Sequence, residues 1–260
     1  FADTPIVFFG VNDMNFGLSF NQVPQVTGIL EATANRETIE TVYSLFGEDT
    51  PMYIITDATP TGQLDFQRFE FELLNMKVQK YEVLSLTTLS HDELIRKASS
   101  LDPSGVIIMI ACFRDHNGES REFSNTLARL RKQTPIPILH LWRHSIGQGI
   151  LGGKVVSHFH QARSAATMAL SILNGADPDQ FKVDSTPPTQ YLFDYQVMQE
   201  YDLGPLDMPV GSEFINLPKN PNPLFSRVLL VAGIFITLLG ATVIGLLIRI
   251  KIKHRQELKI

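Results

Sequence analysis

The feature that most restricts this chain is a run of 21 residues without a charged side chain, from Val228 to Ile248. At about 1.5 Å per residue, a helix of this length crosses a hydrocarbon core of roughly 30 Å. Buried helices of soluble domains seldom stay apolar on every face for so long. Basic side chains follow at once, as they do on the cytoplasmic side of membrane helices: Arg249, Lys251, Lys253, His254, Arg255 and Lys259. We therefore predict one transmembrane helix at 228–248.

This helix implies an orientation for the rest of the chain. Residues 249–260 form a basic cytoplasmic tail, and residues 1–227 lie on the outer side of the membrane. The chain begins at Phe1, without an initiator Met, a signal peptide or an earlier membrane helix that would export it. The sequence therefore predicts a fragment whose beginning is missing.

Composition excludes two other classes of protein. With 44% apolar and 19% charged residues, the chain can bury a sizeable core and is not a disordered protein. The net charge is -5, and the basic residues outside the tail are scattered, so nucleic acid is not an expected partner. The single cysteine, Cys112, cannot form an internal disulfide, and the apolar residues before it predict a buried thiol.

Short apolar runs alternate with longer amphipathic segments between Pro5 and Leu141, which is the pattern of βαβ units around a parallel sheet. The predicted strands are Ile6–Phe9, Met52–Thr56, Val78–Leu84, Val106–Ala111 and Ile136–Leu141. The predicted helices lie near Arg36–Phe46, Gln63–Asn75, His91–Ser99 and Glu122–Lys132. Asn35 and Ser90 are the expected N-caps of two of these helices, because acidic residues follow each in the first turn.

The pattern changes after Trp142, where a glycine-rich segment occupies residues 147–153. The elements expected next are a strand at Lys154–Val156, a helix at Gln161–Leu173 closed by Asn174 and Gly175, a strand at Gln190–Phe193 and a short helix ending at Tyr201. Five prolines between residues 205 and 227 then predict a stiff, extended connector that leads into the membrane.

Polar residues follow several of the predicted strands. In open parallel sheets ligands bind beyond the carboxyl ends of the strands, so these loops are expected to converge on one rim. The candidate ligand-binding residues are Asn12, Asp13, Asp57, Thr59, Thr61, Arg114, Asp115, Trp142 and Gly149. A structural role is the alternative for each of them, and the segment 57–62 would serve equally as a turn and a helix N-cap.

Three familiar kinds of site do not fit the sequence. Residues 147–152 match G-x-G-x-x-G, but they do not join a strand directly to a helix, so close-packed backbone near a ligand explains these glycines better than a dinucleotide. The histidines at 140, 144, 158 and 160 match no metal-ligand spacing. Cys112 has no evident base beside it, and no G-x-S-x-G occurs. We therefore predict no catalytic residue, no metal and no cofactor.

A series of short motifs occurs in order along the chain: Pro5–Asn12, Thr27-Gly28 before Glu31, Ile54–Asp57, Thr59, Thr61-Gly62, Phe113–Asp115 with Gly118, Leu141-Trp142, Gly147–Gly153 and Tyr191–Tyr195. Together they resemble the extracytoplasmic sensor domains related to ABC-transporter substrate-binding proteins, which begin bacterial membrane histidine kinases and diguanylate cyclases. The match covers residues 5 to 255 and depends on the order of the motifs rather than on any one of them.

The resemblance implies an α/β fold of the type I periplasmic-binding-protein kind, in which two Rossmann-like lobes close over a small-molecule ligand. The first lobe would lack about a hundred residues at its start. The implied division is 1–30 for the remnant of the first lobe, 31–145 for the second lobe, 146–204 for the return to the first lobe and 205–227 for the connector. The strand-end loops would line the cleft between the lobes, although residues 143–145 depart from the acidic or aromatic residues expected there.

The predicted function is therefore a sensor in a bacterial inner membrane, with residues 1–227 in the periplasm and residues 249–260 in the cytoplasm. A missing cytoplasmic kinase or cyclase would receive the signal, and the chain itself is not expected to be an enzyme. Gly233, Thr237 and Gly240 share one helix face on which two copies could dimerise, which crosslinking of Gly→Leu variants would test. The alternatives are a membrane-tethered substrate-binding protein of an ABC transporter, and a periplasmic hydrolase that uses the strand-end aspartates.

Overall fold

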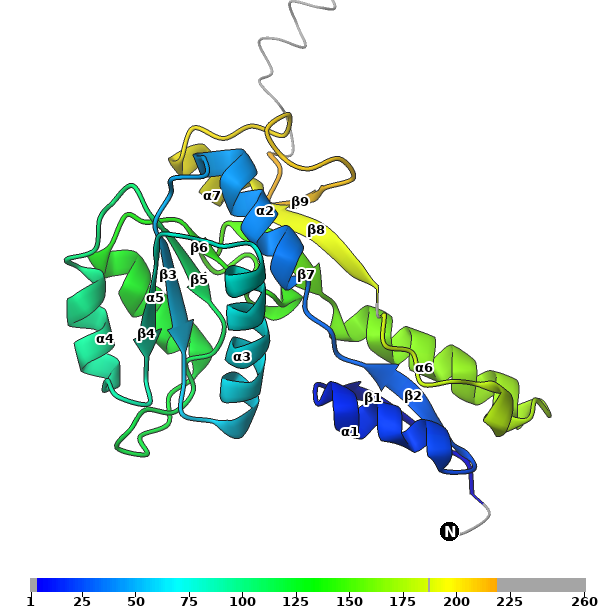
Figure 1. The fold of residues 1–260 in the computed structure, drawn as a ribbon. Helices are drawn as coiled ribbons and strands as arrows, with labels where there is room; N and C mark the ends of the chain where they lie inside the picture. Colours follow the sequence, from blue (N-terminus) through cyan, green and yellow to red (C-terminus); the bar gives the residue numbers. More distant parts are fainter. Residues whose placement is uncertain (1–3, 187, 219–260) are drawn as a thin grey trace, which may run out of the picture. The chain divides into compact units, whose positions relative to one another are not determined.

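The computed structural model describes residues 4–186 and 188–218, which form two β-sheets with helices packed against them (Figure 1). The larger sheet has the strand order β4-β3-β5-β6-β7-β8-β9. Its strands are β3 (Met52–Thr56), β4 (Tyr81–Ser85), β5 (Val106–Met109), β6 (Ile138–Leu139), β7 (Gly152–Val156), β8 (Thr189–Asp194) and β9 (Glu213–Ile215). All neighbouring strands run parallel except β7 and β8. The predicted α/β class is confirmed, with a mixed sheet.

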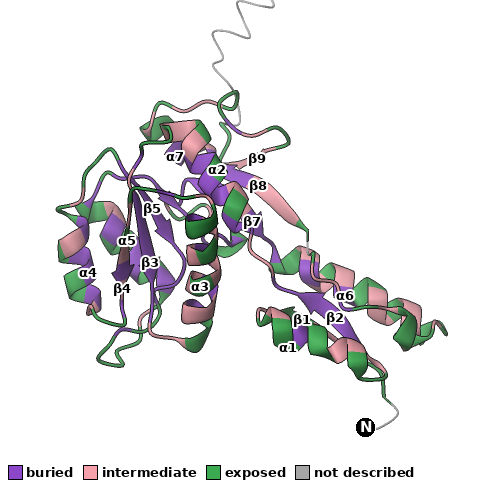
Figure 2. Ribbon diagram, viewed as in Figure 1, coloured by how far each residue is buried: buried purple, intermediate pink, exposed green. Residues whose placement is uncertain are grey.

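Side chains alternate along the central strands and so build one core on each face of this sheet. Met52 and Ile54 belong to the first core, whereas Tyr53 and Ile55 belong to the second, as a period of two residues requires. The first face is covered by α2 (Asn35–Phe46), α3 (Pro60–Asn75) and α7 (Tyr195–Glu200), and the second by α4 (His91–Ala98) and α5 (Phe123–Gln133). Figure 2 shows the burial of β3 and β5, whose apolar sequences suit strands that are covered on both faces.

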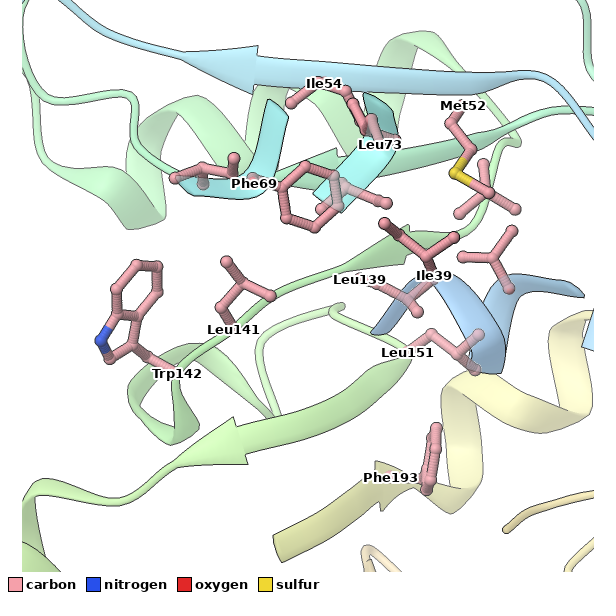
Figure 3. Close-up of a cluster of buried hydrophobic side chains, with 14 of the residues drawn as sticks. Ile39, Met52, Ile54, Phe69, Leu73, Leu139, Leu141, Trp142, Leu151 and Phe193 are labelled. Atoms are coloured by element: carbon pink, nitrogen blue, oxygen red, sulfur yellow. The ribbon is translucent and has the colours of Figure 1, made fainter. Parts of the chain in front are cut away.

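The first core contains the largest buried side chains of the fold. Figure 3 shows Phe69 and Leu73 of α3 packed with Ile54, and Phe193 of β8 beside Leu151. All five of these side chains have no exposed surface. This core therefore holds the helices of the first face against the strands whose ends carry the candidate site.

The smaller sheet pairs β1 (Ile6–Val11) with β2 (Val26–Leu30) in parallel. Helix α6 (His158–Leu173) packs on it, and Thr27 donates a hydrogen bond to the sulfur of Met168 at 3.6 Å. Helix α1 (Met14–Ser19) also contacts it, because a Cβ atom added to Gly17 would lie 2.1 Å from the Leu30 side chain. The chain passes from this sheet to the larger one after β2 and returns between β7 and α6.

Strand β2 is missing from the sequence predictions, and its glycine explains why. Gly28 interrupts the apolar pattern, which weakens the signal for a strand. In the structure a side chain at this position is not tolerated, because its Cβ atom would lie 2.4 Å from the carbonyl oxygen of Phe8. Gly28 thus allows the close pairing of β1 and β2, which the sequence pattern alone does not reveal.

Two local predictions are wrong. Val78 does not begin a strand but lies in the turn after α3, where its N–H donates to the carbonyl of Leu73 at 2.9 Å, and β4 begins at Tyr81. Asn35 does not cap α2 but is its first residue, and the N-cap position belongs to Ala34, which forms no side-chain capping bond. In both cases the boundary shifts because tertiary packing, rather than local propensity, sets the end of the element.

Helix α4 begins with the predicted cap at Ser90, in a full capping box with Glu93. The Ser90 hydroxyl accepts from the Glu93 N–H at 3.3 Å, and the Ser90 N–H donates to the Glu93 carboxylate at 2.8 Å. Ser90→Ala should therefore lower the free energy of unfolding by about 1 kcal/mol, because one orphan N–H loses its partner. Urea unfolding would measure this loss. The exposed Ser100→Ala is the matched control and should change stability by less than about 0.5 kcal/mol; an equal loss in both variants would contradict the capping role.

The segment predicted as an extended connector contains strand β9, which pairs in parallel with β8 through Phe214 and Phe193. The beginning of this segment thus adds a strand to the edge of the large sheet. Among the described residues, no helix has the length and apolar character needed to cross a membrane. The transmembrane helix predicted at 228–248, its stripe of small residues and the basic tail all lie outside the described residues.

Candidate functional site

A cavity of about 150 Å³ opens where the carboxyl ends of β2, β3, β5 and β6 meet the start of α6. Its lining consists of Glu31, Thr59, Thr61, Gly62, Asp65, Ile110, Ala111, Phe113, His140, Trp142, His144 and His158. A larger depression of about 490 Å³ lies between α2 and α3, but its charged groups include the ion pair of Arg36 and Glu72 at 3.3 Å. The smaller cavity is the better candidate, because buried carboxyl groups and aromatic rings converge on it at the rim where α/β sheets bind ligands.

Glu31, which follows β2, connects three segments at one wall of the cavity. Its carboxylate accepts a hydrogen bond from the indole N–H of Trp142 at 2.7 Å and pairs with Nε2 of His158 at 2.9 Å. The bond to Glu31 raises the pKa of His158, although partial burial opposes this shift. Glu31 therefore has an ion-pair partner within the protein when His158 is protonated, and the indole ring of Trp142 is held in a fixed orientation.

His140 and His144 form a second wall, and their tautomers follow from their partners. Nδ1 of His140 lies 2.6 Å from the carbonyl oxygen of Met109, which can only accept, so Nδ1 carries the proton. Burial lowers the pKa of His140 to about 3, so its ring is neutral and Nε2 accepts. Nε2 of His144 lies 3.3 Å from that atom and must therefore donate. Burial also lowers the pKa of His144, and Nδ1 of its neutral ring is left as an acceptor.

Asp65 lies in the second turn of α3 and contributes a second carboxyl group to the cavity. Its side chain is only 3% exposed, and it accepts one hydrogen bond, from the amide of Asn12 at 3.2 Å. Burial raises the pKa of Asp65 to about 6, a shift that Glu31 and Asp57 reinforce and that Asn12 and Arg68 oppose. Asp65 is thus a buried acid that titrates close to neutral pH.

The N-terminus of α3 forms a further part of the lining, and Asp57 builds it. The Asp57 carboxylate accepts from the N–H of Thr59 at 2.9 Å and from the N–H of Phe113 at 2.6 Å, which ties the ends of β3 and β5 together. The Thr59 hydroxyl donates to Asp57 and accepts from the N–H of Gly62, so it caps α3. Thr61, in the first turn of α3, also lines the cavity.

Solved structures resemble this fold. A substrate-binding protein with adhesive properties from Clostridium difficile, in its ligand-free, open form, has a TM-score of 0.63 at 14% identity over 83% of this chain and 72% of that chain. An ABC domain from Streptococcus pneumoniae in complex with L-Trp has a TM-score of 0.59 at 14% identity, with 83% and 75% covered. A conserved domain protein from Vibrio cholerae has a TM-score of 0.58 at 12% identity, with 81% and 71% covered. The fold is that of substrate-binding proteins.

No protein-family model and no curated protein matches the chain. At 12–14% identity the solved structures show the fold alone. The predicted substrate-binding-protein-like architecture is confirmed at that level. What the cavity binds has to be inferred from its own residues.

Three of the predicted ligand-binding residues line the cavity, namely Thr59, Thr61 and Trp142. Asn12 lies one hydrogen bond behind the lining, through Asp65. The remaining predicted residues have structural surroundings. Asp13 is exposed and caps α1 through the N–H of Phe16 at 2.9 Å. Asp57 braces the strand ends as described above.

Asp115, Arg114 and Gly149 also lie outside the lining. Asp115 is buried beyond β5 and accepts from the N–H groups of His91, Asn117 and Glu119, so it shapes a loop. Arg114 is exposed, and its carbonyl oxygen accepts from the N–H of Ala58 at 2.9 Å. Gly149 has a φ of +106° and packs against Arg131 on α5.

Sequence reasoning did not select Glu31, Asp65, His140, His144 or His158 as ligand-binding residues. Glu31 follows the strand that was not predicted, and Asp65 is inside a helix, so neither stands in a predicted strand-end loop. The three histidines match no metal-ligand spacing, and no other local pattern selects them. Among the described residues, no group of three or more His, Cys, Asp or Glu side chains is arranged to hold a metal ion.

Proposed function

We propose that this chain binds a small molecule in the cavity between its strand-end loops. The observation that carries the proposal is the convergence of two buried carboxyl groups and an indole ring, from segments far apart in the sequence, on one enclosed space: Glu31, Asp65 and Trp142. A core that needed only stability would not place acids there, because burying them is unfavourable. The fold shared with substrate-binding proteins supports the same function.

A ligand screen on the full 260-residue chain, purified in a mild detergent because of its apolar segment, would test this proposal. A ligand present at a hundredfold excess over its dissociation constant should raise the apparent stability by about 2.7 kcal/mol. L-Trp is a reasonable first member of the screen, since one structure with this fold contains it. Trp142 is the only tryptophan, so binding of a non-indole ligand should also change its fluorescence.

A blocking variant makes this screen specific to the cavity. Thr61→Phe should fill the mouth of the cavity from an exposed position and abolish the shift, while Thr88→Phe, on an exposed loop outside the lining, should preserve it. A ligand that binds both variants equally well would place the site elsewhere and contradict the proposal.

We further propose that ligand binding is read out across a bacterial inner membrane, as in a sensor whose transmembrane helix at 228–248 leads to a cytoplasmic kinase or cyclase. The 21 uncharged residues and the basic flank support a membrane helix. Delivery of a solute to an ABC permease is the second candidate, because one structure with this fold is a substrate-binding protein. The coding sequence beyond Ile260 distinguishes the two: an output domain favours the sensor, and a stop codon favours tethered delivery.

A further inference from the structure

Asp65 is the one carboxyl group of the cavity lining without a cationic partner among the described residues. It forms no salt bridge there, and its single hydrogen bond comes from the neutral amide of Asn12. Glu31, by contrast, is paired with His158 and bonded to Trp142. Burying an unpaired carboxylate is unfavourable. The described residues supply no cationic partner for Asp65, so a ligand is left to supply it.

The other charged groups near Asp65 do not act as its cationic partner. The guanidinium group of Arg68, one turn further along α3, donates to the backbone carbonyl oxygen of Asn12. Asp57 is bound by Thr59 and by the N–H of Phe113, and it adds negative charge rather than removing it. Glu31 also adds negative charge on this side of the cavity. Arg68 offsets part of this charge, but among the described residues no cationic side chain forms an ion pair with Asp65 itself.

We propose that the ligand of this cavity carries a cationic group, such as a protonated amine, that pairs with Asp65 while its apolar part lies against Trp142 and Phe113. This inference rests on the proposed function and adds the chemical class of the ligand. The aromatic rings suit such a ligand, since they bury its apolar part and their faces attract positive charge. Thr61 also lines the cavity, from an exposed position, and is a polar residue that a further polar group of the ligand could meet.

A cationic ligand and a ligand that is neutral or anionic predict opposite changes of affinity with pH. If Asp65 binds as a protonated acid that donates to a neutral or anionic ligand, affinity falls as the pH rises. If Asp65 pairs with a cation, affinity rises with pH and binding releases a proton. The bond to Glu31 raises the pKa of His158, so the titration of His158 also contributes to the pH dependence, and only the part that is lost with Asp65 is informative.

Four indole probes separate these cases by isothermal titration calorimetry on the full chain in detergent: tryptamine, L-Trp, indole-3-propionate and indole. We expect tryptamine and L-Trp to bind and indole-3-propionate to bind at least tenfold more weakly. The affinity for tryptamine should increase about tenfold between pH 5 and pH 7.5, as Asp65 ionises. Asp65→Asn keeps the shape and can still accept from Asn12, but it should weaken tryptamine binding at least tenfold and flatten the pH dependence.

Asp49→Asn is the matched control, because the Asp49 side chain is 99% exposed, and it should bind tryptamine like the unchanged protein. Tighter binding of indole-3-propionate than of tryptamine, or affinity that falls with pH, would overturn the cationic ligand while leaving the binding function intact. Tryptamine binding that is unchanged in Asp65→Asn would also overturn the pairing of the ligand with Asp65. If none of the four probes binds, the proposal of a cationic ligand is overturned for aromatic amines. The wider ligand screen would then test the proposed binding function separately.

Discussion

Gly152→Ala should lower the free energy of unfolding by about 3 kcal/mol or more. Gly152 begins β7 with a φ of +142°, a conformation that side chains disfavour. A Cβ atom there would lie 2.4 Å from the carbonyl oxygen of Leu192 and 2.8 Å from Cα of Phe193, both on the antiparallel neighbour β8. Because these are backbone atoms in the centre of the sheet, no rotation of a side chain can relieve the contact. Urea unfolding monitored by circular dichroism would measure the loss.

A second glycine separates the steric effect from the backbone effect. Gly118 also has a positive φ, of +80°, but a Cβ atom there would meet nothing within 4 Å. Gly118→Ala should therefore cost only about 1 kcal/mol, which is the penalty for the left-handed conformation. If both variants lost the same amount, close packing of β7 against β8 would not be the reason for the glycine at 152.

Asp65→Asn should stabilise the unliganded protein, and the gain should grow with pH. Burial raises the pKa of Asp65 from 3.8 to about 6, so the folded protein holds this proton more tightly than the unfolded chain does. The stability that Asp65 contributes is fully present below the unfolded pKa and is lost as the pH rises through about 6. Asparagine has no charge to bury, so the gain should be about 1 kcal/mol at pH 4.5 and about 3 kcal/mol at pH 7.5.

Urea unfolding at these two pH values checks the sign directly. Asp49→Asn serves as the control here too, since an exposed carboxylate has no comparable burial to relieve. A gain that is constant between pH 4.5 and pH 7.5, or a loss at pH 7.5, would mean that Asp65 is not a strained buried acid. Stabilisation of the empty protein together with weaker binding of tryptamine would be the signature of a residue kept for its ligand.

Most of the large sheet was predictable because its signals are local, although β9 was not predicted. Met52–Thr56 and Val106–Met109 are short apolar runs between amphipathic helices, and a parallel sheet that is covered on both faces needs such runs. The caps of α3 and α4 are equally local, since a Thr or Ser side chain there bonds to backbone three residues away. Of the small sheet, β1 was predicted and β2 was not. Gly28 is needed in β2 because of the close approach of Phe8 in the neighbouring strand, which the local sequence does not show.

The candidate site was predictable as a place but not as a set of residues. The rule that ligands bind beyond the carboxyl ends of strands located Thr59, Thr61 and Trp142 on the rim. The same rule could not distinguish residues that face the cavity from residues that brace its loops. Asp57 and Asp115 follow strands as Thr59 does, yet their carboxylates are engaged by backbone N–H groups.

The sequence by itself determined the α/β class, the central strands with their helices and the uncharged run at 228–248, because each depends on the order of apolar and polar residues over short distances. Only the tertiary structure decided which acids are buried and what they meet. Glu31 and His158 are separated by 127 positions, and Asn12 and Asp65 by 53, yet each pair is joined by a hydrogen bond at the same cavity. The pairing of Glu31 and the isolation of Asp65 are long-range contacts, and no local pattern encodes them.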